Sequence, residues 1–345
     1  MREIDGSHGE GGGQLIRTAV ALAAISGTEV LIRNVRARRA NPGLAAQHVA
    51  AVRAVAALCD AQVNGLQVGS QELTFRPGRL HGGSFHFDVG TAGSLTLVLQ
   101  AVLPAAVACG ETVHLRLTGG TDVKAAPPLD YLCHVLLALL THMGLQTRVM
   151  VLRRGYYPRG GGEIETEILP VTALHPLVLD TPGPLEAIRG IAHIANLPGH
   201  IVERMKQAAL QEIMGFPDAH IEGRGLGRDD AIGQGGAVVL WAKTAHTLLG
   251  AATVAERGVP AERLGEEAGR ALRAEIQSGA TLDIHTADQM LIYLAMAHGP
   301  SRFLVRTLSS HAQTTIWLLE QFLPVRFVVT PAGELTRVDV YPSAT

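Results

Sequence analysis

One order of predicted elements recurs along the chain, and this recurrence constrains the fold more than any other feature. A strand leads through a glycine-containing loop into a helix, and a second strand, loop and helix and two further strands follow. The copies begin near Arg2, Ser84 and Thr281. Self-similarity of this kind predicts a repeat architecture. Two amphipathic helices per four-stranded sheet predict an α+β fold of three βαβαββ units (α/β sandwich units) around a pseudo-threefold, with a shared helical core.

The third copy and the segment before it carry further expectations. The third copy is expected to open with a strand over 281–285, followed by a helix over 287–297. The segment Pro170–Gly279 does not fit the repeat, and its alternating run Leu185–Ile194 and charged helix after Pro260 predict a small inserted α/β domain. The predicted main body is therefore residues 1–169 and 280–345, and the predicted insert is residues 170–279. Because none of the candidate ligands lies in the insert, we expect it to be peripheral to the chemistry.

Composition limits the cellular location and the kinds of partner that we expect for the protein. Cys59, Cys109 and Cys133 are far apart, form no CxxC pair and fall on predicted helices, which indicates buried reduced thiols and a cytoplasmic location. The N-terminus shows no apolar leader, and the apolar run 95–108 is too short to span a bilayer. A net charge of −2 argues against non-specific coating of nucleic acid. An aromatic content of 4% argues against extended base-stacking surfaces.

A glycine-rich loop stands at the start of the first helix. The stretch Gly9–Gln14 precedes an apolar run, so backbone N–H groups at the helix N-terminus are open to an anion. Glu10, Gln14 and Arg17 lie close to that opening. The loop is not a Walker A motif, because no Gly-Lys-Ser/Thr follows the glycines. From this stretch alone, a phosphate site and a plain tight turn are equally good interpretations.

Candidate ligands also fall on the other loops. Arg36 and Arg39 belong to an arginine cluster before Asn41-Pro42-Gly43, where they could converge on a phosphate, although a solvated basic loop is the simpler interpretation. Gln100 stands two turns into the helix that Gly90–Gly93 opens. Residues 285–289 occupy the expected first loop of the third copy. His311 begins a helix, a position that favours neutral, nucleophilic imidazole, but most such histidines are caps or surface residues.

Convergence of these loops strengthens the catalytic interpretation. If three copies pack around a pseudo-threefold, their matching loops gather at one end of the molecule. A carboxylate pair for a metal, arginines for phosphates and one nucleophilic histidine would then form a nucleotidyl-transfer site. The residues brought together would be Glu10, Arg17, Arg36, Arg39, Gln100, Asp288 and His311.

Several motifs resemble one known family. They are Gly9-Glu10-Gly11-Gly12-Gly13-Gln14 with Arg17, Arg36–Leu44 with Gln47-His48, Gly119-Gly120-Thr121-Asp122, Tyr157-Pro158-Arg159-Gly160-Gly161-Gly162, Ala287-Asp288-Gln289 and the His311 segment. In this order they resemble the RNA 3′-terminal phosphate cyclases over essentially the whole chain. The resemblance implies the fold predicted above. It also implies a nucleotidyl-transferring ligase that adenylylates a histidine with ATP, passes AMP to an RNA 3′-phosphate and closes a 2′,3′-cyclic phosphate in RNA processing.

The resemblance also assigns roles by position. His311 is implied as the nucleophile, and Gln100 with His285, Thr286, Ala287, Asp288 and Gln289 as the residues that contact ATP. Glu10 is implied as the carboxylate for a divalent metal, Mg or Mn. Arg17, Arg36 and Arg39 are implied as phosphate or nucleotide ligands. The implied partners are ATP and an RNA 3′-phosphate end, with no membrane.

Two positions depart from the family pattern, and three other interpretations stay open. Thr314-Thr315 stands where the family commonly has Thr-Asn, and His285 stands where it commonly has tyrosine. A non-catalytic branch of the family lacks the histidine, so His311 argues against it. Enolpyruvyl transferases share similar βαβαββ units but would not require His311. A plain RNA-binding module would call for a more basic or aromatic composition.

Overall fold

The computed structural model describes residues 1–343, and residues 2–76 form a first sheet with two helices packed against it. Helix α1 begins after Gly12 and ends where Gly27 takes the left-handed conformation (φ 65°) that favours glycine. The sheet order is β1-β2-β4-β3, with β1 and β2 parallel. The elements are β1 (Arg2–Asp5), α1 (Gly13–Ser26), β2 (Val30–Arg33), α2 (Ala46–Ala57), β3 (Gln62–Asn64) and β4 (Leu73–Arg76).

The second sheet has the same connectivity with one strand added. Its order is β11-β7-β8-β6-β5, so the first and second strands of the unit are again parallel neighbours. The added strand, β11 (Ala231–Ile232), comes from the predicted insert and pairs with the end of β7. A π-helical stretch separates two short α-helices between residues 129 and 142. The elements are β5 (Gly83–Asp88), α3 (Leu95–Cys109), β6 (Val113–Gly119), α4 (Leu129–Tyr131), η1 (Leu132–Leu136), α5 (Leu137–His142), β7 (Thr147–Gly155) and β8 (Gly162–Ile168).

The third sheet differs from the expectation at its start. Residues 281–285 do not form the expected strand, because Asp283 caps helix α8 by accepting the N–H groups of His285 and Thr286. Leu177–Leu179 instead lies along β14, with Val178 and Arg302 in a parallel bridge. The sheet order is β14-β16-β15. Its elements are α8 (Ile284–Ala295), β14 (Ser301–Val305), α9 (Ser310–Phe322), β15 (Val325–Ala332) and β16 (Leu335–Pro342).

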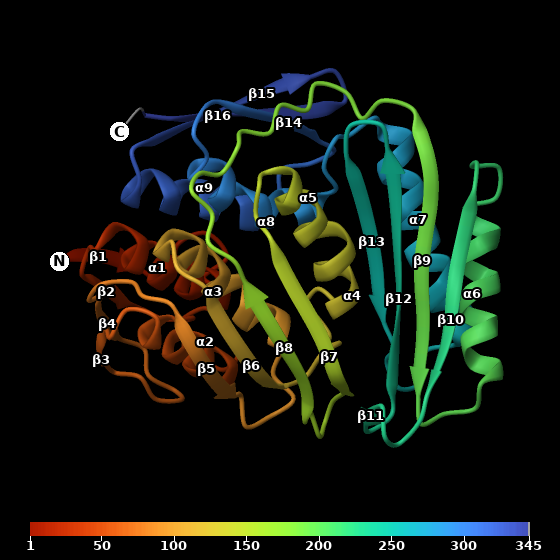
Figure 1. Ribbon diagram of the computed structural model, residues 1–345, viewed down its shortest axis with the longest axis horizontal. Helices are drawn as coiled ribbons and strands as arrows, with labels where there is room; N and C mark the ends of the chain where they lie inside the picture. Colours follow the sequence, from red (N-terminus) through yellow and green to blue (C-terminus); the bar gives the residue numbers. More distant parts are fainter. Residues whose placement is uncertain (344–345) are drawn as a thin grey trace.

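Residues 185–278 form a further sheet with its own small core (Figure 1, right). The sheet order is β10-β9-β12-β13, and α6 and α7 pack against it. Ile188, Met205 and Leu272 are among the residues of its core. The elements are β9 (Leu185–Ala195), α6 (His200–Glu212), β10 (Ala219–Leu226), β12 (Gly235–Thr244), β13 (Leu248–Val254) and α7 (Ala261–Ser278).

The main core lies among the helices of the other three sheets. Helices α1, α2, α3, α8 and α9 contact one another, and apolar side chains from all of them join one continuous core. The sheets lie on the outside of these helices, with β14, β15 and β16 at the top of Figure 1. The predicted α+β fold is confirmed, whereas the pseudo-threefold repeat and the domain boundaries stay predictions. No helix within residues 1–343 is both long and apolar enough to cross a membrane.

Candidate active site

A cleft of about 1060 Å³ opens where the first turns of several helices meet α7. Its main-body side comes from the glycine loop and α1, the loop before α2, the segment before α4, and the starts of α8 and α9. The structure brings most of the predicted site residues here. They are Glu10, Arg17, Arg36, Arg39, Gln100, His285, Asp288, Gln289 and His311.

The glycine loop needs glycine for its conformation and for close approach. Gly9 and Gly11 have φ values of 58° and 56°, in the left-handed region. A Cβ on Gly13 would overlap the imidazole of His48, and a Cβ on Gly9 would overlap Thr314. The tight-turn interpretation is therefore correct as far as the backbone is concerned. The same turn leaves the N-terminus of α1 facing the cleft, where no side chain caps it.

Glu10 joins the glycine loop to the start of α9. Its Oε2 lies 3.3 Å from Nε2 of His311 and 3.4 Å from a guanidinium nitrogen of Arg39. Its Oε1 accepts a short hydrogen bond from Ser310. The hydroxyl of Ser310 lowers the pKa of Glu10, and the charges of His311 and Arg39 lower it further. Glu10 is thus held as a carboxylate beside the imidazole.

This arrangement fits a divalent cation only in part. Mg²⁺ commonly takes one or two protein carboxylates and completes its octahedron with phosphates and water. Glu10 can supply one such carboxylate. Within residues 1–343, no group of three acidic, histidine or cysteine ligands gathers at the cleft. A metal held here would therefore depend on the phosphates of a substrate for its other ligands.

The residue that caps helix α9, Ser309, fixes the position of the helix turn that carries His311. Ser309 accepts the N–H of Ala312 and donates its hydroxyl to Asp288 at 2.6 Å, which ties the start of α9 to α8. Burial raises the pKa of Asp288 to about 6, although the Ser309 hydroxyl and the nearby His311 oppose that shift. The His311 side chain is 44% exposed and faces the cleft.

The arginines have different surroundings. Arg17 is 8% exposed, and burial lowers the pKa of its guanidinium to about 10. Arg36 has φ 52° and donates to the carbonyl of Gly43 at 2.7 Å, and burial lowers its pKa as well. Burial and the charges of Arg17 and Arg36 lower the pKa of His48 to about 3, so His48 is neutral. Arg17, Arg36 and Arg39 thus concentrate positive charge at the cleft, and the neutral His48 adds none.

The predicted ATP contacts divide into two groups. Gln100 donates to Gln289 at 2.6 Å, and Gln289 donates to the backbone carbonyl of His285, so these three form a chain along the cleft. Thr286 and Ala287 are buried and do not line the cleft. They belong to the first turn of α8 and not to a loop, because Asp283 begins that helix earlier than expected.

The insert lines the opposite wall of the cleft. Ala252–Val254 of β13 and Val259, Arg263 and Glu267 near or on α7 face it. Lys124 of the main body is paired across the opening with Glu256 at 2.7 Å. The insert therefore borders the cleft, and the expectation that it is peripheral to the chemistry stays a prediction. The alternation of polar and apolar residues in the insert could not reveal that it lines the cleft, because the wall is formed by ordinary aliphatic and charged residues.

One buried cluster resembles a metal site but is an ionic network. Asp122, Asp130 and His193 bring their ligand atoms within 4.8 Å of one another. Arg154 already occupies their midst, donating to Asp130 at 2.7 and 2.8 Å and to Asp122 at 3.0 Å. Burial alone would lower the pKa of His193, but the two carboxylates outweigh it and raise it. The network joins the Gly119–Asp122 motif to β9 of the insert.

Comparison with known proteins decides the family. The family profile described as RNA 3′-terminal phosphate cyclase matches residues 8–329. The chain belongs to the RNA 3′-terminal phosphate cyclase family. An RNA 3′-terminal phosphate cyclase of Nitrosospira multiformis is 61% identical over 342 residues, covering 99% of this chain and 97% of the relative. Cyclases of Methanopyrus kandleri and Pyrococcus furiosus are 45% and 42% identical, each aligned to 99% of this chain and to 98% and 99% of the relative.

A likeness to solved structures is much weaker. The enolpyruvyl transferase NikO from Streptomyces tendae is 12% identical, with a TM-score of 0.27 over 99% of this chain and 66% of that chain. This value is too low to support any argument. Membership in the cyclase family therefore stands on the family profile and on the sequence relatives above.

Some residues at the cleft were not foreseen. Ser309 and Ser310 orient Asp288 and Glu10, and Tyr293 lies one layer beneath the cleft. The two serines could have been suspected from their place before a helix, where capping is common. No comparable sequence signal marks Tyr293, because its position in the helical pattern is that of an ordinary core residue of α8. Conversely, the Tyr157–Gly162 motif does not line the cleft, and Tyr157 itself is exposed.

Proposed function

We propose that this chain converts an RNA 3′-terminal phosphate to a 2′,3′-cyclic phosphate at the expense of ATP. His311 Nε2 attacks the α-phosphorus of ATP, a P–N bond forms and pyrophosphate leaves. AMP then passes from His311 to an oxygen of the RNA 3′-phosphate. The neighbouring 2′-OH attacks the activated phosphorus, loses its proton and displaces AMP, so the products are the cyclic phosphate, AMP and pyrophosphate.

The observation that carries this proposal is the placement of His311. The His311 side chain is 44% exposed and lines the cleft, its Nε2 lies 3.3 Å from Oε2 of Glu10, and the residue stands on the first turn of a helix. A partial positive charge at the helix N-terminus favours phosphate oxygens near the attacking nitrogen. The carboxylate of Glu10 can orient the imidazole and stabilise positive charge that develops on it when the P–N bond forms.

Other residues supply binding and charge. We assign Gln100, Gln289 and His285, which form a hydrogen-bonded chain, to the nucleotide, and Arg17, Arg36 and Arg39 to its phosphates or those of RNA. A divalent cation held by Glu10 would offset charge when two polyanions meet. The final ring closure needs little beyond positioning, because an adjacent hydroxyl reacts at high effective molarity.

Two other functions predict different outcomes. A non-catalytic family member would need no nucleophile at this position, and an enolpyruvyl transferase would need no ATP. The test is incubation with ATP labelled at the α-phosphate, Mg²⁺ or Mn²⁺ and an oligoribonucleotide with a 3′-phosphate. We expect a 2′,3′-cyclic end and one labelled AMP released per end. An unchanged 3′-phosphate in the presence of bound ATP would contradict the proposal.

A further inference from the structure

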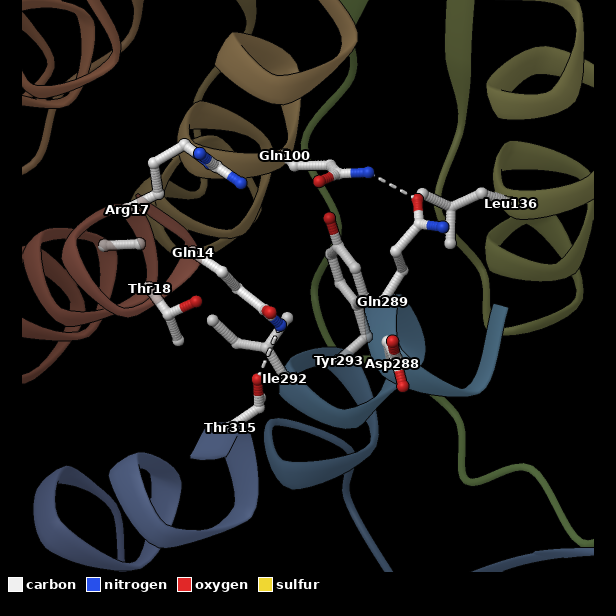
Figure 2. A pocket seen from close by; sticks show the side chains of 11 residues that line it. Gln14, Arg17, Thr18, Gln100, Leu136, Asp288, Gln289, Ile292, Tyr293 and Thr315 are labelled. Atoms are coloured by element: carbon white, nitrogen blue, oxygen red, sulfur yellow. Dashed lines mark hydrogen bonds between the residues drawn. The ribbon is translucent and has the colours of Figure 1, made fainter. Parts of the chain in front are cut away.

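A small polar chamber lies directly behind the cleft. It has a volume of about 50 Å³, and Gln14, Arg17, Gln100, Asp288 and Gln289 line both the chamber and the cleft. Thr18 and Tyr293 belong to the chamber alone. Figure 2 shows side chains from α1, α3, α8 and α9 converging on it. The chamber is too small for a nucleotide but has room for a few waters.

Two buried donors face this chamber without a protein partner. Within residues 1–343, no hydrogen bond or ion pair joins the guanidinium of Arg17 or the hydroxyl of Tyr293 to another residue, and burial is the sole cause of the pKa shift of each. Arg17 is 8% exposed and Tyr293 is 2% exposed. Neither group is among the side-chain atoms that are wholly buried without a partner, so both keep some contact with the chamber space. In an empty chamber each donor would lose about 1–3 kcal/mol, and more when it is charged, so we expect the chamber to hold something that accepts hydrogen bonds.

The neighbouring groups show what kind of occupant fits. In Figure 2 the hydroxyl of Tyr293 is directed toward the space between Arg17 and Gln100. The amides that line the chamber offer both donors and acceptors, while Gln14 is engaged with Thr315 at 2.9 Å and Gln100 with Gln289. A volume of about 50 Å³ holds roughly three waters at ~15 Å³ each. Water satisfies every group present, including the acceptor side of the tyrosine hydroxyl.

We propose that the chamber is a permanent water site and that Tyr293 is a positioning residue that acts through this water on Arg17. The inference rests on the proposed function in one respect, the assignment of Arg17 to a phosphate. Water on the chamber side solvates the buried guanidinium, which would otherwise carry the full cost of burial. Tyr293 fixes the water, and the water keeps the guanidinium turned toward the cleft. The phosphate then meets an arginine that is already in place.

The test compares two tyrosines that differ only in location. Tyr293→Phe removes the chamber hydroxyl. Tyr156→Phe is the control, because the Tyr156 hydroxyl is buried without a partner beside the Asp122–Arg154 network and does not line the chamber. For each variant, the dissociation constants of two short oligoribonucleotides, one with a 3′-phosphate and one with a 3′-hydroxyl, are measured by calorimetry without ATP. The dissociation constant of the 3′-hydroxyl oligonucleotide divided by that of the 3′-phosphate oligonucleotide reports recognition of the phosphate alone.

We expect Tyr293→Phe to reduce this ratio about tenfold and Tyr156→Phe to leave it within twofold of the unchanged protein. A purely structural role of Tyr293 would weaken both ligands equally, and equal ratios for the two variants would overturn the proposal. If Tyr293→Phe does not fold, Thr18→Val at the same chamber takes its place with the same expectation.

A crystal structure of the unchanged protein gives a second, independent answer. Ordered water bonded to both the Tyr293 hydroxyl and the Arg17 guanidinium is the expected result, and an empty chamber would overturn the proposal. Neither readout uses ATP. If the unchanged protein binds both oligonucleotides equally but holds this water, Arg17 does not recognise the phosphate, which contradicts that part of the proposed function. The water site would still stand.

Discussion

Glu10 and His311 meet across the cleft, with Oε2 of Glu10 lying 3.3 Å from Nε2 of His311. One residue belongs to the glycine loop before α1 and the other to the first turn of α9, so the fold alone brings them together. The pair gives Glu10 two possible contributions, because the same oxygen can orient the imidazole or bind a cation. Substitution can separate them.

Glu10→Gln tests which contribution dominates. The amide keeps a hydrogen-bonding oxygen near Ser310 but loses the charge that would bind a cation. We expect adenylylation to fall by about a hundredfold, or roughly 2.7 kcal/mol of transition-state stabilisation, with partial recovery at high Mg²⁺ or Mn²⁺. The measurement is the rate of AMP transfer to the protein against metal concentration. An unchanged metal dependence would mean that Glu10 acts on His311 without holding a metal.

Asp288 should make the protein less stable as the pH rises. Its folded-state pKa of about 6 lies above the ordinary value of 3.8 for an aspartate, so its stabilising contribution is full below pH 3.8 and is lost as the pH rises through 6. Asp288→Asn removes the carboxylate and keeps an oxygen for the Ser309 hydroxyl. We compare the free energy of unfolding of the variant with that of the unchanged protein, and we expect this difference to be about 1–2 kcal/mol more favourable to the variant at pH 7.5 than at pH 4. Urea unfolding of both proteins at both pH values measures it. The same difference at the two pH values would contradict the raised pKa.

The buried ionic network should be essential to stability. Arg154 has 7% of its side chain exposed and compensates two buried carboxylates, so Arg154→Met leaves Asp122 and Asp130 facing each other. Removing one partner of a buried pair costs about 3–5 kcal/mol. Arg116→Met is the control, because Arg116 pairs with Glu163 at the surface with half of its side chain exposed. Thermal unfolding of both variants is the measurement. Equal losses would show that the network stabilises no more than a surface pair.

Much of the architecture could be predicted from the sequence. Alternation and helical periodicity located most strands and helices, because burial on one face imposes those patterns directly. The start of the third sheet could not be foreseen. The capping of α8 by Asp283 competes with strand formation over 281–285, and Leu177–Leu179 lies beside β14 through backbone hydrogen bonds that no side-chain pattern encodes.

Some residues of the candidate site could likewise be predicted from the sequence, and others could not. Glu10 and His311 were expected together because matching loops of the repeat should gather at one end, and both line the cleft, although their roles stay predictions. The insert wall and Tyr293 were missed because their residue types are ordinary and only their position gives them significance. Thr286 and Ala287 were expected in the cleft because the loop was placed one helical turn too late, and the true cap buries them.

The proposed reaction requires that His311 carry AMP. Mass spectrometry of the protein after incubation with ATP and divalent metal, followed by mapping of the modified peptide, tests this requirement. His311→Ala is compared with His285→Ala, which removes another cleft histidine, one proposed to bind the nucleotide. We predict one AMP on the peptide that contains His311, released in mild acid and retained in alkali, reduced in His285→Ala and absent in His311→Ala. Undiminished AMP on the His311→Ala protein would show that another residue is the nucleophile.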